Sequence, residues 1–232
     1  MNQQKVLDQI IKIHDENNLG LQNNKWGTDK MNPKSYYEKF YSKIISQLGE
    51  IRFILEIGVR GGSSMFLWQK LFPEASVIGC DLEDINTELG PKSEYVTLKN
   101  STFIKGNAYS EEISSGIDTG LDLAIDDGSH FLEDQLKFVE LYLPKLSDKG
   151  VLVIEDVQRG YVHVLEVFRN VNLNEFKVEA HDFRFNKAQY DDFIITISRG
   201  KTSKIYIAYG IFRALLFPFS HLALKLFTKK YI

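Results

Sequence analysis

The sequence contains little that would place the protein outside the cell or across a membrane. Its single cysteine, Cys80, excludes an internal disulfide. No uncharged apolar run approaches the roughly 20 residues that a membrane-spanning helix needs. The opening segment, MNQQKVLDQIIKIHDENN, lacks the apolar core of a signal peptide. Internal repeats, low-complexity segments and charged blocks are also absent. We therefore expect a cytoplasmic protein that does not span a bilayer.

The overall charge is also small, which argues against one class of partner. The formal net charge is -3, so no global basic field would attract nucleic acid. Hydrophobic residues make up 44% of the chain and aromatic residues 12%, which is ample for one large core. The sequence predicts one main domain with appendages and no nucleic-acid partner.

The last part of the sequence has an unusual composition. From Lys204 to Ile232 there is no acidic residue, while five residues are basic and many are Ile, Leu, Phe or Tyr. This composition fits helices packed on the core, a surface for homo-oligomer formation, or a helix in peripheral contact with the inner membrane. Packing or oligomerisation is the preferred interpretation. We divide the chain into an N-terminal helical lid or substrate region (1–50), a core (51–200) and an apolar, basic, helical tail (201–232).

Helix-like and strand-like segments alternate along the core. After two N-terminal helices at 3–17 and 33–48, short apolar runs predict strands at 52–58, 76–82, 102–107, 121–127, 151–157, 176–183 and 191–199. Helical spacing between these runs predicts helices at 63–72, at 131–146, where SDKG would end the helix, and at 161–171. The alternation favours an α/β fold with a doubly wound, mostly parallel, seven-stranded sheet. Ligands then bind beyond the carboxyl ends of the strands.

The residues that follow the first two strands indicate a nucleoside-type cofactor. A glycine loop after the first strand, beginning at Gly58, allows a ligand to approach the backbone, and Asp81 at the end of the second suits a ribose diol. A dinucleotide fingerprint needs glycine where this chain has Arg60, which disfavours an NAD-dependent oxidoreductase.

Carboxylates gather after the fourth and fifth strands. Asp126 and Asp127 end the run LDLAIDDGSH, and Asp156 follows the neighbouring strand. Clustered acids repel one another unless a cation compensates, and oxygen ligands of this kind suit Mg²⁺. His130 would lie beside that cation, where a neutral imidazole can take a proton from an alcohol. These residues predict metal-assisted chemistry on a hydroxyl group.

Four motifs in order carry a family resemblance: GTDK (27–30), LEIGVRGGSS, IDDGSH and VIEDV. The glycine motif resembles the S-adenosylmethionine loop of class I methyltransferases. The complete set, over about residues 24–200, is similar to the metal-dependent sugar O-methyltransferases, the group of the mycinamicin and other macrolide-sugar enzymes and of cephalosporin-hydroxylase-like proteins. The resemblance implies S-adenosylmethionine and Mg²⁺ as cofactors.

The resemblance also implies roles for individual residues. His130 would be the general base, with Asp127 beside it in catalysis, and Asp127, Asp156 and less directly Asp126 would hold the metal. Cofactor contacts would come from Thr28, Lys30, Glu56, Gly58, Arg60, Gly61, Ser63, Asp81, Asn107 and Asp126. Two departures are clear. Asn107 stands where the family usually has an acid, and the Tyr-rich segment NPKSYYEKFY lacks the family's histidine.

The acceptor is expected to be a hexose or heptose of a bacterial surface polysaccharide, linked to a nucleotide or within a glycan. Substrate contacts are expected from Tyr36, Tyr37, His181 and Asp192, with Tyr41 and Asp191 as further candidates. Two other functions stay open. One is a metal-independent methyltransferase acting on a small molecule, and the other is a non-catalytic partner of the same fold in a glycan-assembly complex.

Overall fold

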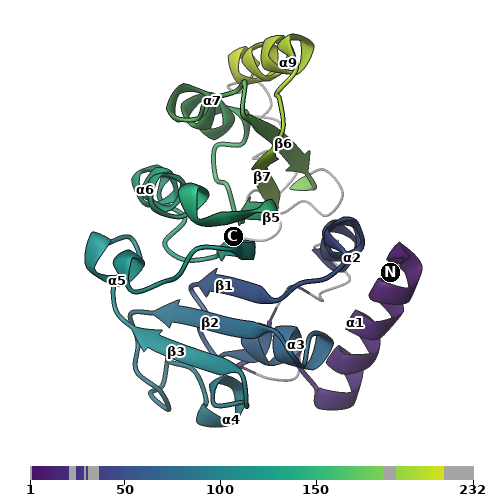
Figure 1. The fold of residues 1–232 in the computed structure, drawn as a ribbon, viewed down its shortest axis with the longest axis vertical. Coiled ribbons are helices and arrows are strands. Elements are labelled where there is room, and N and C mark those ends of the chain that lie inside the picture. Colours follow the sequence, from purple (N-terminus) through teal and green to yellow (C-terminus); the bar gives the residue numbers. More distant parts are fainter. Residues whose placement is uncertain (1, 21–24, 29, 31–36, 185–191, 217–232) are drawn as a thin grey trace, which may run out of the picture.

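The computed structural model describes residues 2–20, 25–28, 30, 37–184 and 192–216. The chain order of the elements is shown in Figure 1. They are α1 (Gln3–Asn17), α2 (Tyr37–Leu48), β1 (Phe53–Ile57), α3 (Ser63–Leu71), β2 (Ser76–Asp81), α4 (Ser93–Val96), β3 (Ser101–Lys105), α5 (Glu111–Ser115), β4 (Leu121–Asp126), α6 (Leu132–Tyr142), the 3₁₀ turn η1 (Leu143–Lys145), β5 (Leu146–Ile154), α7 (Tyr161–Asn170), β6 (Phe176–Asp182), β7 (Phe193–Arg199) and α9 (Lys204–Leu215).

The strands form one seven-stranded sheet in the order β3-β2-β1-β4-β5-β7-β6. Pairing is parallel from β3 to β5, and β7 runs antiparallel to both β5 and β6. The strand order reverses between β1 and β4, so the loops after these two strands diverge to opposite sides and leave a crevice at their carboxyl ends. The predicted fold class, mostly parallel and doubly wound, is confirmed.

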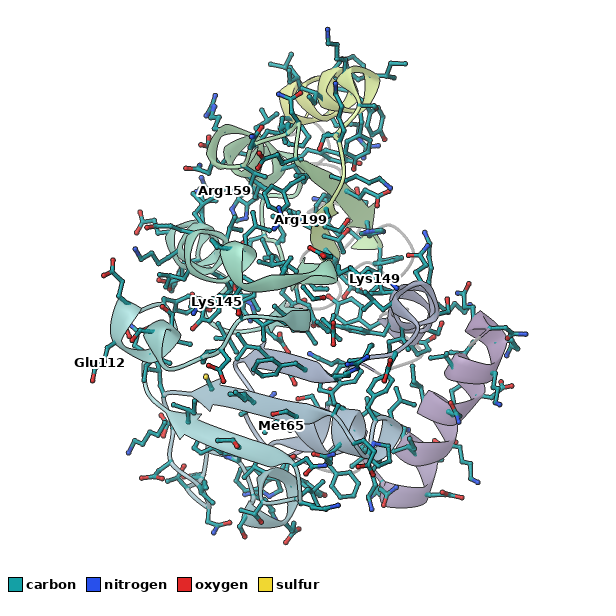
Figure 2. The ribbon with its side chains drawn as sticks, in the orientation of Figure 1. Met65, Glu112, Lys145, Lys149, Arg159 and Arg199 are labelled. Carbon is teal, nitrogen blue, oxygen red and sulfur yellow. The ribbon has the colours of Figure 1, made fainter. Side chains whose placement is uncertain are left out.

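Helices cover both faces of the sheet, which explains why its strands read as continuous apolar runs. Alternate residues of β1 point to opposite faces, so Ile54 joins one core with α1, α2 and α3, and Leu55 joins the other with α6 and α7. Met65 of α3, labelled in Figure 2, is inaccessible. Its sulfur lies where a side chain on Gly79 of β2 would stand. The two cores hold the strand ends in fixed positions.

One predicted boundary was wrong. The sequence SDKG (147–150) was expected to end the helix before it, but these residues belong to β5, and α6 ends at Tyr142. Pro144 has no backbone N–H to donate, so the chain passes through the turn η1 and enters the strand early. The pairing of β5 with β4 has a register shift between Leu121 and Leu123, which accommodates the extra length. The short helices α4 and α5 were not predicted.

Part of the predicted C-terminal helical tail is seen as α9, which packs against α7; residues 217–232 lie outside the described residues. Among the helices that the structure describes, none has both the length and the apolar character needed to cross a membrane.

Candidate active site

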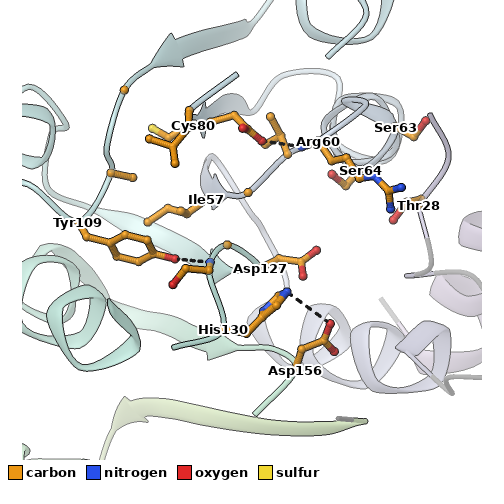
Figure 3. Close-up of a pocket in the computed structure, with 18 of the residues that line it drawn as sticks. Thr28, Ile57, Arg60, Ser63, Ser64, Cys80, Tyr109, Asp127, His130 and Asp156 are labelled. Carbon is orange, nitrogen blue, oxygen red and sulfur yellow. Dashed lines mark hydrogen bonds and ion pairs between the residues drawn. The ribbon is translucent and has the colours of Figure 1, made fainter. Parts of the chain in front are cut away.

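A cavity of about 390 Å³ opens at the carboxyl ends of the parallel strands, where the strand order reverses (Figure 3). This volume lies in the ~300–1,000 Å³ range of small-molecule sites. Residues from the glycine turn, from the ends of β2 and β4 and from three loops line it. They are Gly27, Thr28, Ile57, Gly58, Val59, Arg60, Ser63, Ser64, Cys80, Asp81, Leu82, Gly106, Ala108, Tyr109, Asp127, Gly128, Ser129, His130 and Asp156.

Gly58 brings the turn after β1 against the loop after β4. Its φ is +79°, and a Cβ there would lie 2.1 Å from the backbone oxygen of Asp127. A hydrogen bond of 2.9 Å from Asp127 N to Ile57 O also joins the two segments, and Gly58 N donates one of 2.9 Å to Cys80 O of β2. Only glycine fits this contact, which leaves bare backbone facing the cavity.

Asp81 organises the opposite side of the glycine turn. Its Oδ2 accepts a hydrogen bond of 2.8 Å from the backbone N of Arg60, and its Oδ1 accepts one of 3.1 Å from Glu83 N. Arg60 has a left-handed backbone, with φ of 44°. The carboxylate of Asp81 therefore fixes the turn while it lines the cavity, and its remaining lone pairs suit the two hydroxyls of a ribose.

Asp127, His130 and Asp156 converge at the other end of the cavity (Figure 3). One ligand atom from each lies within 4.8 Å of the others. His130 Nε2 is 3.9 Å from Asp156 Oδ2, and the Tyr37 hydroxyl donates a 2.7 Å hydrogen bond to Asp156 Oδ1. His130 and Asp156 both have positive φ, 59° and 50°, a conformation that side chains disfavour. Two carboxylates and an imidazole at this spacing match the donor set of a divalent cation.

Lys30 is wholly buried beneath this group of residues and contacts three carboxylates. Its Nζ lies 2.7 Å from Asp127 Oδ2 and 3.1 Å from both Glu56 Oε1 and Glu155 Oε2. Burial alone lowers the pKa of Lys30, but the three negative charges outweigh it and hold that pKa well above its ordinary value. Tyr41 donates a short hydrogen bond to Glu155 Oε1. The ammonium thus holds the carboxylate of Asp127 from below.

Asp126 lies behind the loop and does not line the cavity. Burial raises its pKa to about 7, partly offset by hydrogen bonds from the Tyr109 hydroxyl at 2.6 Å and from Gly128 N at 3.2 Å. The same hydroxyl accepts a hydrogen bond from Ser129 N. Asp126 and Tyr109 together set the course of the segment that leads to His130.

Solved structures share this architecture. The MycE methyltransferase from the mycinamycin biosynthetic pathway, in complex with Mg, SAH and mycinamycin VI, superposes on 84% of this chain and 54% of its own with a TM-score of 0.60 and 17% sequence identity. The chain has the class I methyltransferase fold. Residues 55–157, which run from within β1 to just beyond β5, match the family model described as a methyltransferase domain.

Two curated methyltransferases are similar in sequence. The 8-demethyl-8-alpha-L-rhamnosyl tetracenomycin-C 2'-O-methyltransferase of Streptomyces olivaceus is 26% identical over 142 residues, which are 58% of this chain and 36% of that protein. The mycinamicin VI 2''-O-methyltransferase of Micromonospora griseorubida is 32% identical over 119 residues, 47% of this chain and 28% of that protein. The resemblance to sugar O-methyltransferases is confirmed. The matched segments span about a third of the relatives' own length.

The methyltransferase fold brings together most of the residues predicted to form the site. Eight of the predicted residues line the cavity, namely Thr28, Gly58, Arg60, Ser63, Asp81, Asp127, His130 and Asp156. Five others expected at the cofactor support it from outside, namely Lys30, Glu56, Gly61, Asn107 and Asp126. Glu56 accepts a 2.9 Å hydrogen bond from Trp68 Nε1, and Asn107 Oδ1 accepts one of 3.0 Å from Tyr109 N. These two side chains therefore form hydrogen bonds that hold the end of a strand and a turn in place.

The expected substrate residues are less concentrated. Tyr37 reaches the site through Asp156. His181 instead donates to or accepts from Thr196 Oγ1 at 3.1 Å and packs on Phe40, and neither it nor Asp192 lines the cavity. Tyr36 and Asp191 lie outside the described residues.

Two residues that position other side chains of the site were given no role by the sequence analysis. Tyr109 lies four residues beyond β3, and nothing in its surroundings in the sequence marks it. Glu155 directly precedes Asp156 in the motif VIEDV, so its position at a strand end was a usable signal. It is fully buried and accepts from both Lys30 and Tyr41.

Proposed function

We propose that this protein transfers a methyl group from S-adenosylmethionine to a sugar hydroxyl, assisted by a divalent metal ion, most simply Mg²⁺. The convergence of Asp127, His130 and Asp156 at one end of a cavity that begins at the glycine turn and Asp81 carries the proposal. The similarity to two sugar O-methyltransferases and to a structure that contains Mg and SAH supports it.

The residues at the glycine turn fit the cofactor. The bare backbone at Gly58 permits close approach, and Asp81 offers acceptors for ribose hydroxyls. The exposed side chain of Leu82, also at the cavity, offers an apolar surface beside that carboxylate. A sulfonium held from this end would direct its methyl group toward the end of the cavity where His130 lies.

His130 has the surroundings of a general base. Loss of the hydroxyl proton makes the acceptor oxygen nucleophilic; the new O–CH₃ bond forms as the S–CH₃ bond breaks, and the sulfonium becomes a neutral thioether. The imidazole takes the proton, and the Asp156 carboxylate, 3.9 Å from Nε2, stabilises the resulting positive charge. Tyr37 holds Asp156 through its hydroxyl.

Asp127 and Asp156 would hold a divalent cation, and His130, which has a ring nitrogen within 4.8 Å of both carboxylates, would stay uncoordinated and take the proton. A bound cation would supply Lewis acidity, which lowers the pKa of a coordinated hydroxyl. Lys30 engages one oxygen of Asp127 and leaves the carboxylate a second oxygen for this purpose.

The acceptor and cellular setting extend the proposal. We propose a hexose or heptose of a bacterial surface polysaccharide, nucleotide-linked or within a glycan, methylated in the cytoplasm by a homo-oligomer. The N-terminal region (1–50) would act as the lid or substrate region, because α2 carries Tyr37 to Asp156. The remaining predicted roles of Lys30, Asn107, His181 and Asp192 stay predictions.

The test combines binding with turnover. We expect calorimetry to show that S-adenosylmethionine binds and NAD does not. With a panel of nucleotide sugars, S-adenosylhomocysteine should form only when Mg²⁺ is present. His130→Ala should retain cofactor binding and lose ~10²–10⁴-fold in turnover. Asp118→Asn, at an exposed acid outside the site, is the matched control and should match wild type.

Three outcomes would contradict the proposal in different ways. Preference for NAD would overturn the assignment of the glycine turn. Full turnover in chelator would favour the metal-independent methyltransferase. Cofactor binding without turnover on any acceptor in the panel would favour the non-catalytic partner.

A further inference from the structure

Helix α9 is fixed to the body of the protein along one side. Gly210 lies so close to Phe168 of α7 that a Cβ would stand 2.9 Å from its ring. Arg213 forms an ion pair of 3.3 Å with Asp182 of β6, and the Tyr206 hydroxyl accepts a hydrogen bond from Ala180 N. These three contacts lie on the same side of the helix and determine which side faces outward. Figure 1 places α9 at one end of the longest axis of the molecule.

The side that faces outward is almost entirely apolar. Its exposed residues, spaced along one broad arc of the helix, are Lys204, Ile205, Ala208, Tyr209, Ile211, Phe212, Leu215 and Leu216. Three large side chains are conspicuously open, with 84% of Ile205, 72% of Leu215 and 58% of Phe212 accessible. A helix on a protein surface normally turns its apolar stripe inward. In α9 the large apolar side chains instead face outward.

The outward face has almost no groups that could form hydrogen bonds with a protein. The Tyr209 hydroxyl already accepts a hydrogen bond of 2.8 Å from Arg213, which leaves Lys204 as the one charged group of the arc. Protein interfaces carry about one hydrogen bond per 100–200 Å², so a protein partner would find few polar contacts here. The acyl chains of a lipid layer form no hydrogen bonds, so an apolar face can be buried among them without polar contacts.

The charged side chains on the outward face and in the segment that leads into it are Lys201 and Lys204, and both are basic. Lys201 and Lys204 are exposed, and neither forms an ion pair with any residue that the structure describes. After Asp192 the sequence contains no further Asp or Glu. Apolar and aromatic side chains with lysines at their edge, and no acid in the helix itself, are the composition of a helix that lies in a membrane interface and is attracted by anionic lipids.

We propose that the outer face of α9 binds the surface of a membrane that contains anionic lipids. The helix would lie parallel to the bilayer, with Ile205, Phe212 and Leu215 among the acyl chains and Lys201 and Lys204 at the headgroups. This inference rests on α9 alone and does not depend on the proposed methyl transfer.

The test is flotation of the full chain with vesicles of phosphatidylcholine alone or of phosphatidylcholine mixed with phosphatidylglycerol. The protein should float with the mixed vesicles and, at low salt, bind them more tightly than the neutral ones. Ile205→Ser/Phe212→Ser should weaken binding to the mixed vesicles by about tenfold or more, because two buried apolar side chains are lost. Lys201→Gln/Lys204→Gln should weaken it by about fivefold for each lysine.

Matched controls separate lipid binding from misfolding and from self-association. Leu89→Ser, at a side chain 65% exposed away from α9, should bind vesicles like wild type. All variants should keep the urea midpoint of the wild type, since the substituted side chains are exposed. Failure of the wild type to float, or undiminished flotation of Ile205→Ser/Phe212→Ser, would overturn the proposal. So would a wild-type dimer in light scattering that these substitutions dissociate, together with no vesicle binding.

Discussion

Replacing Lys30 by methionine removes the one ammonium that the described residues place among Glu56, Asp127 and Glu155, while it retains most of the side-chain volume. Two of these carboxylates are fully buried, so the substitution leaves negative charge in the interior without its counterion. Breaking a buried ion pair by removing one partner costs about 3–5 kcal/mol. We expect a comparable loss in the free energy of unfolding of Lys30→Met at pH 7.

The loss in stability should depend on pH, because protonation of a buried carboxylate would remove the uncompensated negative charge. Burial already raises the pKa of Glu56, and without Lys30 that carboxyl can take a proton. For a glutamate with an ordinary pKa of ~4.3, protonation costs at most about 3.7 kcal/mol at pH 7 and about 1 kcal/mol at pH 5. The destabilisation of Lys30→Met should therefore fall from about 3 kcal/mol at pH 7 to about 1 kcal/mol at pH 5.

Urea unfolding followed by circular dichroism at both pH values measures this difference. Lys12→Met is the control, because Lys12 is 69% exposed and, among the described residues, forms an ion pair only with Glu16, so its loss should cost no more than about 0.5 kcal/mol. A loss below 1 kcal/mol for Lys30→Met at pH 7, or one that does not shrink at pH 5, would refute the reasoning about the buried charges.

Two further predictions concern the glycine turn and a buried histidine. Gly58→Ala should abolish calorimetric binding of S-adenosylmethionine, because its Cβ would stand 2.1 Å from Asp127 O; unchanged affinity would show that the two loops can separate freely. Burial lowers the pKa of His163 to about 4, so the unfolded state binds the extra proton first and stability should fall as pH drops from about 6.5 through 4, by up to about 3 kcal/mol. His163→Gln should flatten this decline in urea unfolding, and an unaltered slope would assign it to other groups.

Most of the strands could be predicted because they contain a compact apolar run that is followed by glycine or an acid. The runs beginning at Phe53 and Leu121 fit strands buried on both faces, and the structure confirms them to within a residue or two. The placement of Asp81, Asp127 and Asp156 at one edge followed from the parallel topology alone. Because parallel strands end at the same edge of the sheet, residues that follow different strands in the sequence line one cavity.

The supporting contacts could not be predicted, because they join residues that are far apart in the chain. Lys30 meets Asp127 across 97 positions and Glu155 across 125, and the family motif led us to expect Lys30 at the cofactor. Asp126 and Asp127 are adjacent in sequence yet face opposite ways. Strand alternation turns Asp126 toward the buried side, where it meets Tyr109, and leaves Asp127 at the cavity.

This alternation has a consequence for the charge of the proposed metal site. Lys30 carries one positive charge against three carboxylates, and Asp156 adds a fourth acid 3.9 Å from His130. The buried ammonium therefore fixes the position of Asp127 without neutralising the cluster, and the excess negative charge is open to ligands on the side that faces the cavity. A cation bound there would lower this repulsion, so under the proposed function added Mg²⁺ should raise the stability of the wild type, and the gain should grow with the logarithm of its concentration above Kd. Asp156→Asn, which removes one negative charge and replaces a carboxylate oxygen by a neutral and weaker amide ligand, should reduce that gain.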